Sequence, residues 1–348
     1  MRSRLAAAIA IAILSAAAPS SAQSPARPPA PLFAASAPLK LTLTAPLSGL
    51  IRNREASGAV AGTLVDPSGV SLPVAVSLRG LTRRTKEICD FPPLRIDFTS
   101  PPPATSIFAG QRRLKLVTHC RKSEAFQQHV LLEYAAYRMY NLLTPRSFRA
   151  RLANIDYRDS DGKPLASRVG FFIENLNAVA ERNGTRRAQG GERIPMSFLS
   201  PADAGRYALF QHMIGNHDWS MRAGPPGDDC CHNAELIGTL APGATIPLPY
   251  DFDFSGLVDA PYATPPDVLR LNNVRQRQFR GYCTHNAQTA AAAAEMRAAR
   301  PAILGALNEV PGLDGRSRGK AAAYLEGFFA EIATDESVAS RTLKRCIG

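Results

Sequence analysis

Hydrophobic and polar residues alternate along several short stretches near the start of the chain, which is the pattern of strands with one buried face. The stretches are LKLTLTAPL (39–47), LPVAVSLRG (72–80), LRIDF (94–98) and RRLKLVTHC (112–120). Two further strand-like runs lie within 148–175, on either side of Asp161-Gly162, a dipeptide typical of hairpin turns. The pattern predicts a sheet followed by a hairpin.

A helical pattern interrupts the strands. SEAFQQHVLLEYAAYRMYNLL (123–143) has apolar residues at helical spacing, with Ser123 as a candidate N-cap and Pro145 beyond its end. After residue 175, helical patterns dominate, over 176–182, 201–214, 287–308 and 317–334. We predict an α+β chain with a β-rich part over 39–174, which includes one long helix, and a mainly helical part over 175–348.

The first residues have the pattern of a secretory signal peptide. Arg2 and Arg4 precede an apolar run, and Ser20-Ser21-Ala22 provides small residues for cleavage. We expect a signal peptide over 1–22 and a disordered, Pro/Ala-rich leader over 23–38, in a periplasmic or secreted protein. No later segment has 18 uncharged apolar residues, so no stable membrane span is expected.

The chain has 348 residues, of which 45% are hydrophobic, and this is enough to bury a core. Its net charge of +12 attracts anions such as phosphorylated ligands or acidic polymers. We therefore expect a protein or an anionic envelope polymer as partner. The absence of nucleic-acid-binding signatures and the predicted export argue against nucleic acid. The oligomeric state stays open.

The six cysteines suit disulfides in an oxidising compartment. Zinc is the alternative, with ligands among Cys230, Cys231, His232, Cys283 and His285. Disulfides are favoured because adjacent cysteines rarely make a good tetrahedral pair. We expect disulfides from Cys230 and Cys231 to distant cysteines to pin the segment MRAGPPGDDCC (221–231) to its surroundings.

The segment PLPYDFDFSGLV (247–258) places two acids inside an apolar run. A strand would point Asp251 and Asp253 to the same face, where they would repel each other. A bound cation would relieve this repulsion, and a turn that uses both acids as backbone caps is the alternative. We favour the metal, with Phe252 and Phe254 on the packed side.

Four further residues could serve phosphoryl transfer. Lys115 lies in a predicted strand and Glu133 in the next helix, an arrangement that can hold nucleotide phosphates. Asp218 follows a predicted helix in GNHDWS, and Asn233 comes 15 residues later. An Asp near the acceptor hydroxyl, an Asn and an Asp on Mg²⁺, and a Lys on phosphate form the set that this chemistry needs.

The order of these motifs resembles the spore-coat protein H (CotH) kinase-like family over about residues 60–260. The similar segments are VSLRGLTRR, RRLKLVTHC, GFFIEN, GNHDWS with HN, and YDFDFSG. The resemblance implies a two-lobed protein-kinase-like fold, with a β-rich N-lobe over 39–174 and a helical C-lobe over 175–348. It also implies an exported kinase that transfers phosphate from ATP, with Mg²⁺ or Mn²⁺, to a protein or other hydroxyl acceptor.

The resemblance also implies roles for individual residues. Asp218 would be catalytic, Lys115 would contact phosphates with Glu133 orienting it, and Glu174 would lie near the adenine pocket. Asn233 and Asp251 would bind the metal, with Asp253 as a second ligand or as support.

The departures from the family pattern leave open an alternative, a catalytically inactive kinase-like binding module of the cell envelope. Leu81 replaces the usual Asn, no Gly-rich loop is present, and the 15-residue separation of Asp218 from Asn233 exceeds the roughly five of protein kinases. A metallophosphoesterase is a weaker alternative, because GNHD lacks the other ligand segments of that class. The arginines of LRLNNVRQRQFRGYC (269–283) suit an anion site or a solvated helix face.

Overall fold

The computed structural model describes residues 29–55 and 58–348. The predicted signal peptide, residues 1–22, lies outside the described residues, as do residues 23–28 of the predicted leader. Pro31–Phe33 form a short 3₁₀ helix, η1, whose Leu32 and Phe33 are buried in the core of the β-rich part. The end of the predicted disordered leader is therefore ordered.

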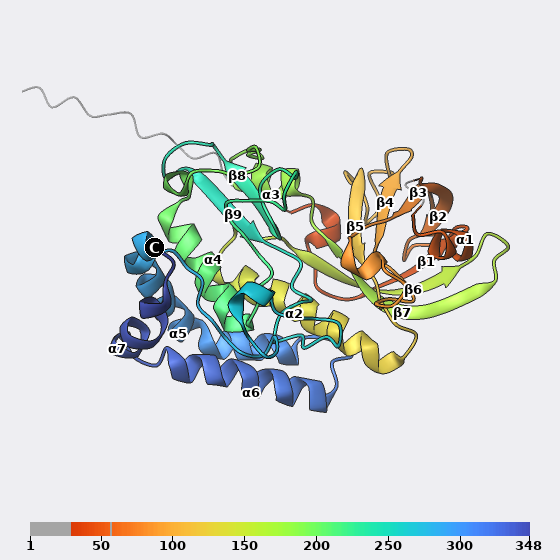
Figure 1. Ribbon diagram of the computed structural model, residues 1–348. Helices are drawn as coiled ribbons and strands as arrows, with labels where there is room; N and C mark the ends of the chain where they lie inside the picture. Colours follow the sequence, from red (N-terminus) through yellow and green to blue (C-terminus); the bar gives the residue numbers. More distant parts are fainter. Residues whose placement is uncertain (1–28, 56–57) are drawn as a thin grey trace, which may run out of the picture.

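Seven strands form a closed barrel, seen at the right of Figure 1. They are β1 (Leu39–Thr44), β2 (Val60–Val65), β3 (Ser71–Leu78), β4 (Leu94–Phe98), β5 (Arg113–Val117), β6 (Ala150–Arg158) and β7 (Pro164–Ile173). Their order around the barrel is β1-β2-β3-β4-β5-β7-β6. β1 and β6 run parallel and close the barrel, whereas the other pairs are antiparallel.

The prediction of a two-lobed kinase-like fold is wrong. The β-rich part is a closed barrel and not the N-lobe sheet of that fold, because β1 pairs with β6 from Leu39 with Ala153 to Thr44 with Arg158. Closure removes the sheet edges, so every strand is paired on both sides. The broader α+β description still applies.

The alternation along the strands explains the barrel core. On β5, Leu114 and Leu116 point inward with Val74 and Val76 of β3, whereas Lys115 is only partly covered on the other face. Phe108, from the loop before β5, fills the interior and is fully buried. The same alternation thus builds the core and presents Lys115 outside the barrel.

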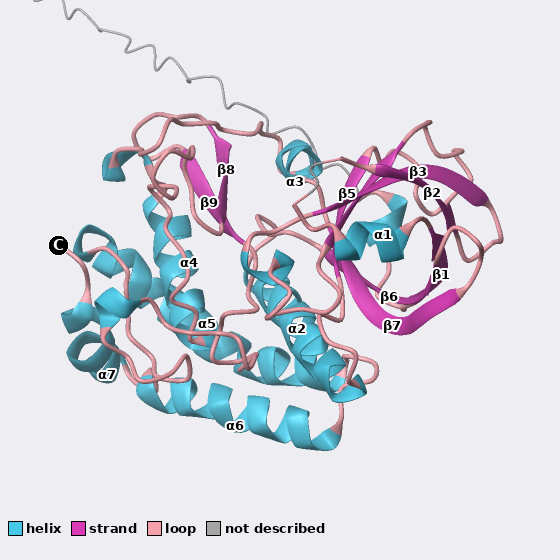
Figure 2. Cartoon of the chain, turned by 45° about the vertical axis from the view of Figure 1, so that its right-hand side comes forward, coloured by secondary structure: helices cyan, strands magenta, loops and turns pink. Residues whose placement is uncertain are grey.

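Helices and one hairpin make up the rest of the chain. They are α1 (Leu47–Arg52), α2 (Gln127–Leu143), α3 (Leu176–Arg182), α4 (Pro201–Ile214), β8 (Ala234–Gly238), β9 (Thr245–Pro249), α5 (Asn286–Asn308), α6 (Gly315–Glu331) and α7 (Asp335–Ser337). α2 lies between the barrel and the other long helices (Figure 2), and it belongs to their hydrophobic core. The predicted ranges 176–182 and 201–214 are confirmed.

Three disulfides are present, which confirms the preference for disulfides over zinc and suits an oxidising compartment. They join Cys89 to Cys120, Cys230 to Cys231 and Cys283 to Cys346. The expected pinning of 221–231 to a distant cysteine is wrong. The four other cysteines pair in the barrel and near the C-terminal residue 348, which leaves Cys230 and Cys231 to each other.

None of the described helices is both long and apolar enough to cross a membrane.

Candidate active site

One face of α2 contacts the segment that follows β9. His129 Nδ1 lies 3.0 Å from the carbonyl oxygen of Val258, and the Tyr137 hydroxyl accepts a hydrogen bond of 2.9 Å from the Asp251 amide. Glu133 lies between these two residues on the helix, at spacings of four residues. A regular helical repeat therefore holds the 251–258 segment and places Glu133 beside it.

The backbone turns sharply at Asp251. Its φ of 63° lies in the left-handed region, so the chain leaves β9 in a turn, and the predicted strand geometry for Asp251 and Asp253 is wrong. Both carboxylates nevertheless reach the same partner, the guanidinium of Arg83. Phe252, which lies between the two aspartates in the sequence, is buried and packs against Tyr137, with ring centroids 4.6 Å apart. Its predicted position on the packed side is therefore confirmed.

Gly256 brings this segment against the end of α4. Its amide donates to the carbonyl of Gly215 at 3.0 Å. A Cβ at Gly256 would lie 2.4 Å from the Tyr324 hydroxyl and 2.5 Å from the Val274 carbonyl, so the approach requires glycine. Because α4 leads directly to Asp218, this contact places Asp218 on the same side as Asp251.

Glu133, Asp251 and Asp253 form what we call the carboxylate centre. One oxygen from each lies within 4.8 Å of the other two. Arg83 contacts all three, at 3.4 Å from Glu133 and 3.2 Å from each aspartate. Glu133 Oε1 is buried and has no hydrogen-bond partner among the described residues.

Burial dominates the protonation of the carboxylate centre. It raises the pKa of Glu133 to about 8, although Arg83 opposes this shift. Burial likewise raises the pKa of Asp253 to about 6, again against Arg83. Fully ionised, the centre would hold three negative charges against one positive charge, and burial makes this excess of negative charge costly.

Lys115 lies beside this centre, but it does not form the predicted pair with Glu133. The Lys115 ammonium contacts Glu235 of β8 at 3.5 Å and lies 4.4 Å from the centre of the Tyr250 ring. Desolvation lowers its pKa, and Arg79 lowers it further. Arg83 from the β3–β4 connection reaches Glu133 instead.

Asp218 makes a compact group with His232 and Asn233. His232 Nε2 lies 2.6 Å from Asp218 Oδ1, and Asn233 Nδ2 donates to Asp218 Oδ2 at 2.9 Å. Its hydrogen bond to Asp218 raises the pKa of His232. The long insert does not displace Asn233, because the Ser220 amide bonds to the His232 carbonyl at 2.9 Å and closes the insert as a side loop.

Asn233 is therefore tied to Asp218 and not to the carboxylate centre. Its side-chain nitrogen donates to the carboxylate and the carbonyl of Asp218, and its own carbonyl accepts from the Tyr250 amide at 3.3 Å. The group of three acids among the described residues that could hold a metal ion contains Glu133 in addition to the predicted Asp251 and Asp253. In this geometry, Asn233 supports Asp218 and the backbone before Asp251.

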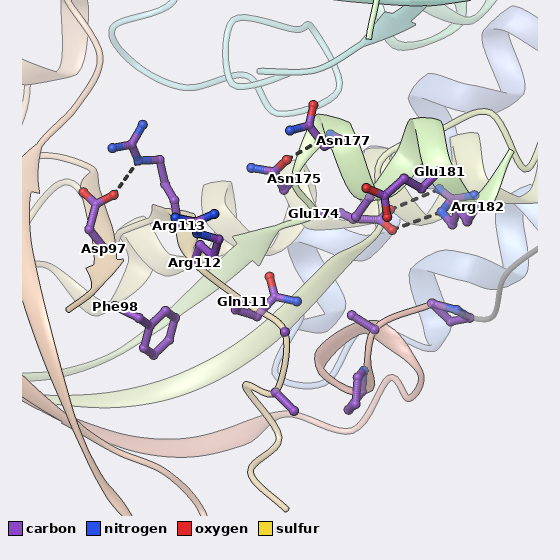
Figure 3. Close-up of a pocket in the computed structure, with 16 residues that line it drawn as sticks. Asp97, Phe98, Gln111, Arg112, Arg113, Glu174, Asn175, Asn177, Glu181 and Arg182 are labelled. Atoms are coloured by element: carbon purple, nitrogen blue, oxygen red, sulfur yellow. Dashed lines mark hydrogen bonds and ion pairs between the residues drawn. The ribbon is translucent and has the colours of Figure 1, made fainter. Parts of the chain in front are cut away.

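Glu174 lies outside the carboxylate centre, in a pocket of about 820 Å³ between β5 and α3 (Figure 3). Its carboxylate points to Arg182, with contacts of 3.0 and 3.1 Å, and also accepts from the Arg149 amide. Glu174 lines the pocket, but its oxygens are committed to these partners. Arg113, which lies two residues before Lys115 on β5, lines the same pocket.

The sequence does not predict the place of two residues at the site, Arg83 and His232. Arg83 stood in the quoted segment VSLRGLTRR, but nothing in its spacing indicates that it reaches Glu133, 50 residues away. The sequence indicates His232 only as a zinc ligand. Its place next to Asn233 was the available signal, since any fold that brings Asn233 to Asp218 also brings His232 near.

The remaining motifs have structural roles. In GNHD, Asn216 and His217 are buried, and His217 Nε2 lies 2.8 Å from the carbonyl of Gln276. In the arginine-rich run, Arg277 stacks on Tyr324 and Arg280 on Trp219. These two arginines pack against the helical part and do not form an anion site or a solvated face.

No protein-family model matches the chain, and no curated protein matches it either. The site must therefore be interpreted from its own geometry.

Proposed function

We propose that this chain is an exported phosphotransferase that binds ATP with Mg²⁺ or Mn²⁺ and transfers a phosphoryl group to a hydroxyl group of a protein or another acceptor. The observation that carries the proposal is the carboxylate centre, where the buried Glu133 Oε1 has no hydrogen-bond partner in the part of the chain that the structure describes. Carboxylate oxygens are the preferred ligands of these cations. Glu133, Asp251 and Asp253 would hold the ion, which neutralises phosphate charge when bound.

A nucleotide could reach the carboxylate centre from the pocket beside Glu174. A volume of about 820 Å³ is within the usual range for small-molecule sites. Arg113 lines this pocket, and Lys115 follows on the same face of β5, about 7 Å further along the strand. A polyphosphate that extends from the pocket would therefore meet the Lys115 ammonium before it reaches Asp251.

Asp218 and His232 are suited to handle the acceptor proton. Both oxygens of Asp218 already accept hydrogen bonds, from His232 and from Asn233. About a third of the Asp218 side chain remains exposed, so an acceptor hydroxyl can approach it. On attack, that hydroxyl would give its proton to this pair while the bond between the γ-phosphorus and the bridging oxygen breaks and ADP leaves.

One observation favours a second candidate, a catalytically inactive binding module. Arg83 occupies the carboxylate centre and Lys115 is paired with Glu235, so both cationic partners of a nucleotide site are engaged within the chain. In this case the cleft would bind a partner without transferring phosphate.

Thermal unfolding of the chain with Mn²⁺, with ATP and with both together tests the proposal. We expect stabilisation by ATP only when the metal is present, and incorporation of label from γ-labelled ATP into the chain or an added hydroxyl acceptor. Asp251→Asn should weaken metal-dependent ATP binding by about tenfold or more, because a charged ligand oxygen is lost. If ATP never stabilises the wild-type chain, the proposal fails.

Asp259→Asn is the matched control. Asp259 also has a left-handed backbone, with φ 52°, and it pairs with Arg275 on the surface, outside the carboxylate centre. We expect ATP binding by this variant to equal that of the wild type. Metal-dependent binding without transfer would favour the inactive binding module.

A further inference from the structure

Arg83 lies where a cation would lie in the carboxylate centre. Its three guanidinium nitrogens each contact a different acid: Nη1 contacts Glu133, Nη2 contacts Asp251 and Nε contacts Asp253. The side chain is 7% exposed. A single arginine therefore serves three carboxylates, with no bidentate pairing to any of them.

The fit of Arg83 is loose. Its contacts of 3.2 to 3.4 Å are longer than the roughly 2.7–2.9 Å of charge-assisted hydrogen bonds. A smaller ion with a double charge could approach the same oxygens more closely and could also use Glu133 Oε1, which Arg83 leaves without a partner.

Another buried arginine in the barrel shows what a fixed guanidinium looks like. Arg54 donates to the backbone carbonyls of Ile51, Cys89 and Asp90, which are neutral acceptors and carry no charge that a divalent cation would neutralise. Among the described residues, the side-chain hydrogen bonds of Arg83 go only to carboxylates of the centre. Arg83 is thus held by the groups that would bind a metal.

We propose that Arg83 is a displaceable counter-ion, and that a divalent cation replaces it among Glu133, Asp251 and Asp253 when a polyphosphate is present to bind the released guanidinium. This inference rests on the divalent-cation site of the proposed function. Arginine binds phosphate oxygens in a bidentate manner. Lys115 and Arg79 lie on the same side and add positive charge for the polyphosphate.

This replacement of Arg83 makes metal binding depend on the presence of a polyphosphate. Without a polyphosphate, a metal must expel a buried positive charge that has no other anion to contact. With a polyphosphate, the metal and Arg83 each gain a partner. The carboxylate centre therefore discriminates against free metal ions, and metal and polyphosphate bind together.

Equilibrium dialysis of Mn²⁺ against the whole chain tests this inference without ATP or any acceptor. The wild type should bind Mn²⁺ weakly alone and more tightly when inorganic triphosphate is added. Arg83→Gln should bind Mn²⁺ alone at least tenfold more tightly than the wild type, because the competing charge is gone. Triphosphate should then increase Mn²⁺ binding by this variant less than it does for the wild type.

Arg300→Gln is the matched control, since it removes a surface arginine that pairs with Glu326. It should bind Mn²⁺ as the wild type does. If Arg83→Gln does not fold by circular dichroism, Arg83→Lys replaces it. Lysine keeps the charge but not the three-way contact, so Mn²⁺ alone should again bind more tightly than to the wild type.

Mn²⁺ affinity that is unchanged or weaker in the folded Arg83 variant overturns the inference. So does a wild type that binds Mn²⁺ equally well with and without triphosphate. Neither result depends on phosphoryl transfer. A conditional metal site in a chain that never transfers phosphate would keep this inference and remove the proposed function.

Discussion

Arg182 and Arg83 are both buried arginines that contact buried acids, but their surroundings differ. Arg182 contacts Glu174 through two nitrogens, at 3.0 and 3.1 Å, and its remaining donors bind the backbone carbonyls of Pro145 and Ser147. One positive charge meets one negative charge. Arg83 meets three acids through single, longer contacts and leaves a buried oxygen without a partner.

The difference separates a structural ion pair from a candidate functional centre. A balanced, fully hydrogen-bonded pair has nothing to gain from a ligand, and it fixes α3 to the barrel hairpin. An unbalanced group of carboxylates stores electrostatic repulsion that a cation can relieve. The lesson is that charge balance and hydrogen-bond completeness identify the site here, whereas burial alone does not.

The largest expected effect comes from breaking the balanced pair. Glu174→Gln leaves the buried Arg182 charge without its carboxylate, so we expect the free energy of unfolding to fall by about 3–5 kcal/mol. Urea denaturation followed by circular dichroism measures this loss. Mn²⁺ binding by the folded fraction should not change, because Glu174 is outside the carboxylate centre.

Glu181→Gln is the control, on α3 next to Arg182. Glu181 is exposed, and surface substitutions usually change stability by no more than about 0.5 kcal/mol. If Glu174→Gln costs no more than Glu181→Gln, the Arg182–Glu174 pair is not the structural element that its geometry indicates.

Local signals explain how much of the helical part could be predicted. α3 begins after Asn175, whose side chain accepts from the Asn177 amide, and α4 starts with Pro201 and ends at Gly215 in a left-handed conformation. Such caps act within a few residues and can be found in the sequence. This is why the bounds of both helices were predicted correctly.

The barrel could not be predicted in the same way. Its closure depends on the parallel pairing of β1 with β6, more than 100 residues apart, and on β2, whose sequence VAGTLV has no clear alternation. At the site, the acids Asp251 and Asp253 could be found from their spacing. The cation that meets them could not, because the choice between Lys115 and Arg83 depends on how the barrel presents each side chain.

A third buried group, His119, sharpens the comparison because it has no acidic partner at hydrogen-bond distance among the described residues. It packs between Phe91 and Tyr157 in the barrel, and its Nδ1 has no hydrogen bond there. Burial lowers the pKa of His119 to about 4 from 6.5. The folded state therefore resists protonation, and stability is lost as the pH falls from 6.5 toward 4, by about 3 kcal/mol in total.

Denaturant titrations at pH 7, 5.5 and 4 check this expectation. His119→Phe should reduce the loss on acidification, because phenylalanine has no proton to gain in the unfolded state. The half-buried His232 is not a suitable control, since it contacts Asp218. If His119→Phe and the wild type lose the same stability on acidification, other titratable groups cause the loss.

The smallest effect is a gain in stability and not a loss. It compares the carboxylate centre most directly with the Arg182–Glu174 pair. Glu133→Gln makes the same chemical change as Glu174→Gln, but in the centre with excess negative charge. Arg83 keeps Asp251 and Asp253 as partners, so with EDTA present at pH 8 we expect the free energy of unfolding to rise by about 1 kcal/mol. Urea denaturation in the presence of EDTA measures it.

The stability difference between Glu133→Gln and the wild type depends on pH, and this dependence tests the sign of the difference independently. Burial raises the pKa of Glu133 to about 8 from 4.5, so the folded state holds a proton that the unfolded state has released. Wild-type stability is therefore lost as the pH rises from 4.5 toward 8, whereas glutamine does not titrate. The stability of the variant relative to the wild type should therefore increase as the pH rises from 5 to 8, and at pH 8 the variant should also have lost its Mn²⁺ binding. If Glu133→Gln is instead as destabilising as Glu174→Gln at every pH, the carboxylate centre is an ordinary structural ion cluster, and the distinction between the two arginines does not hold.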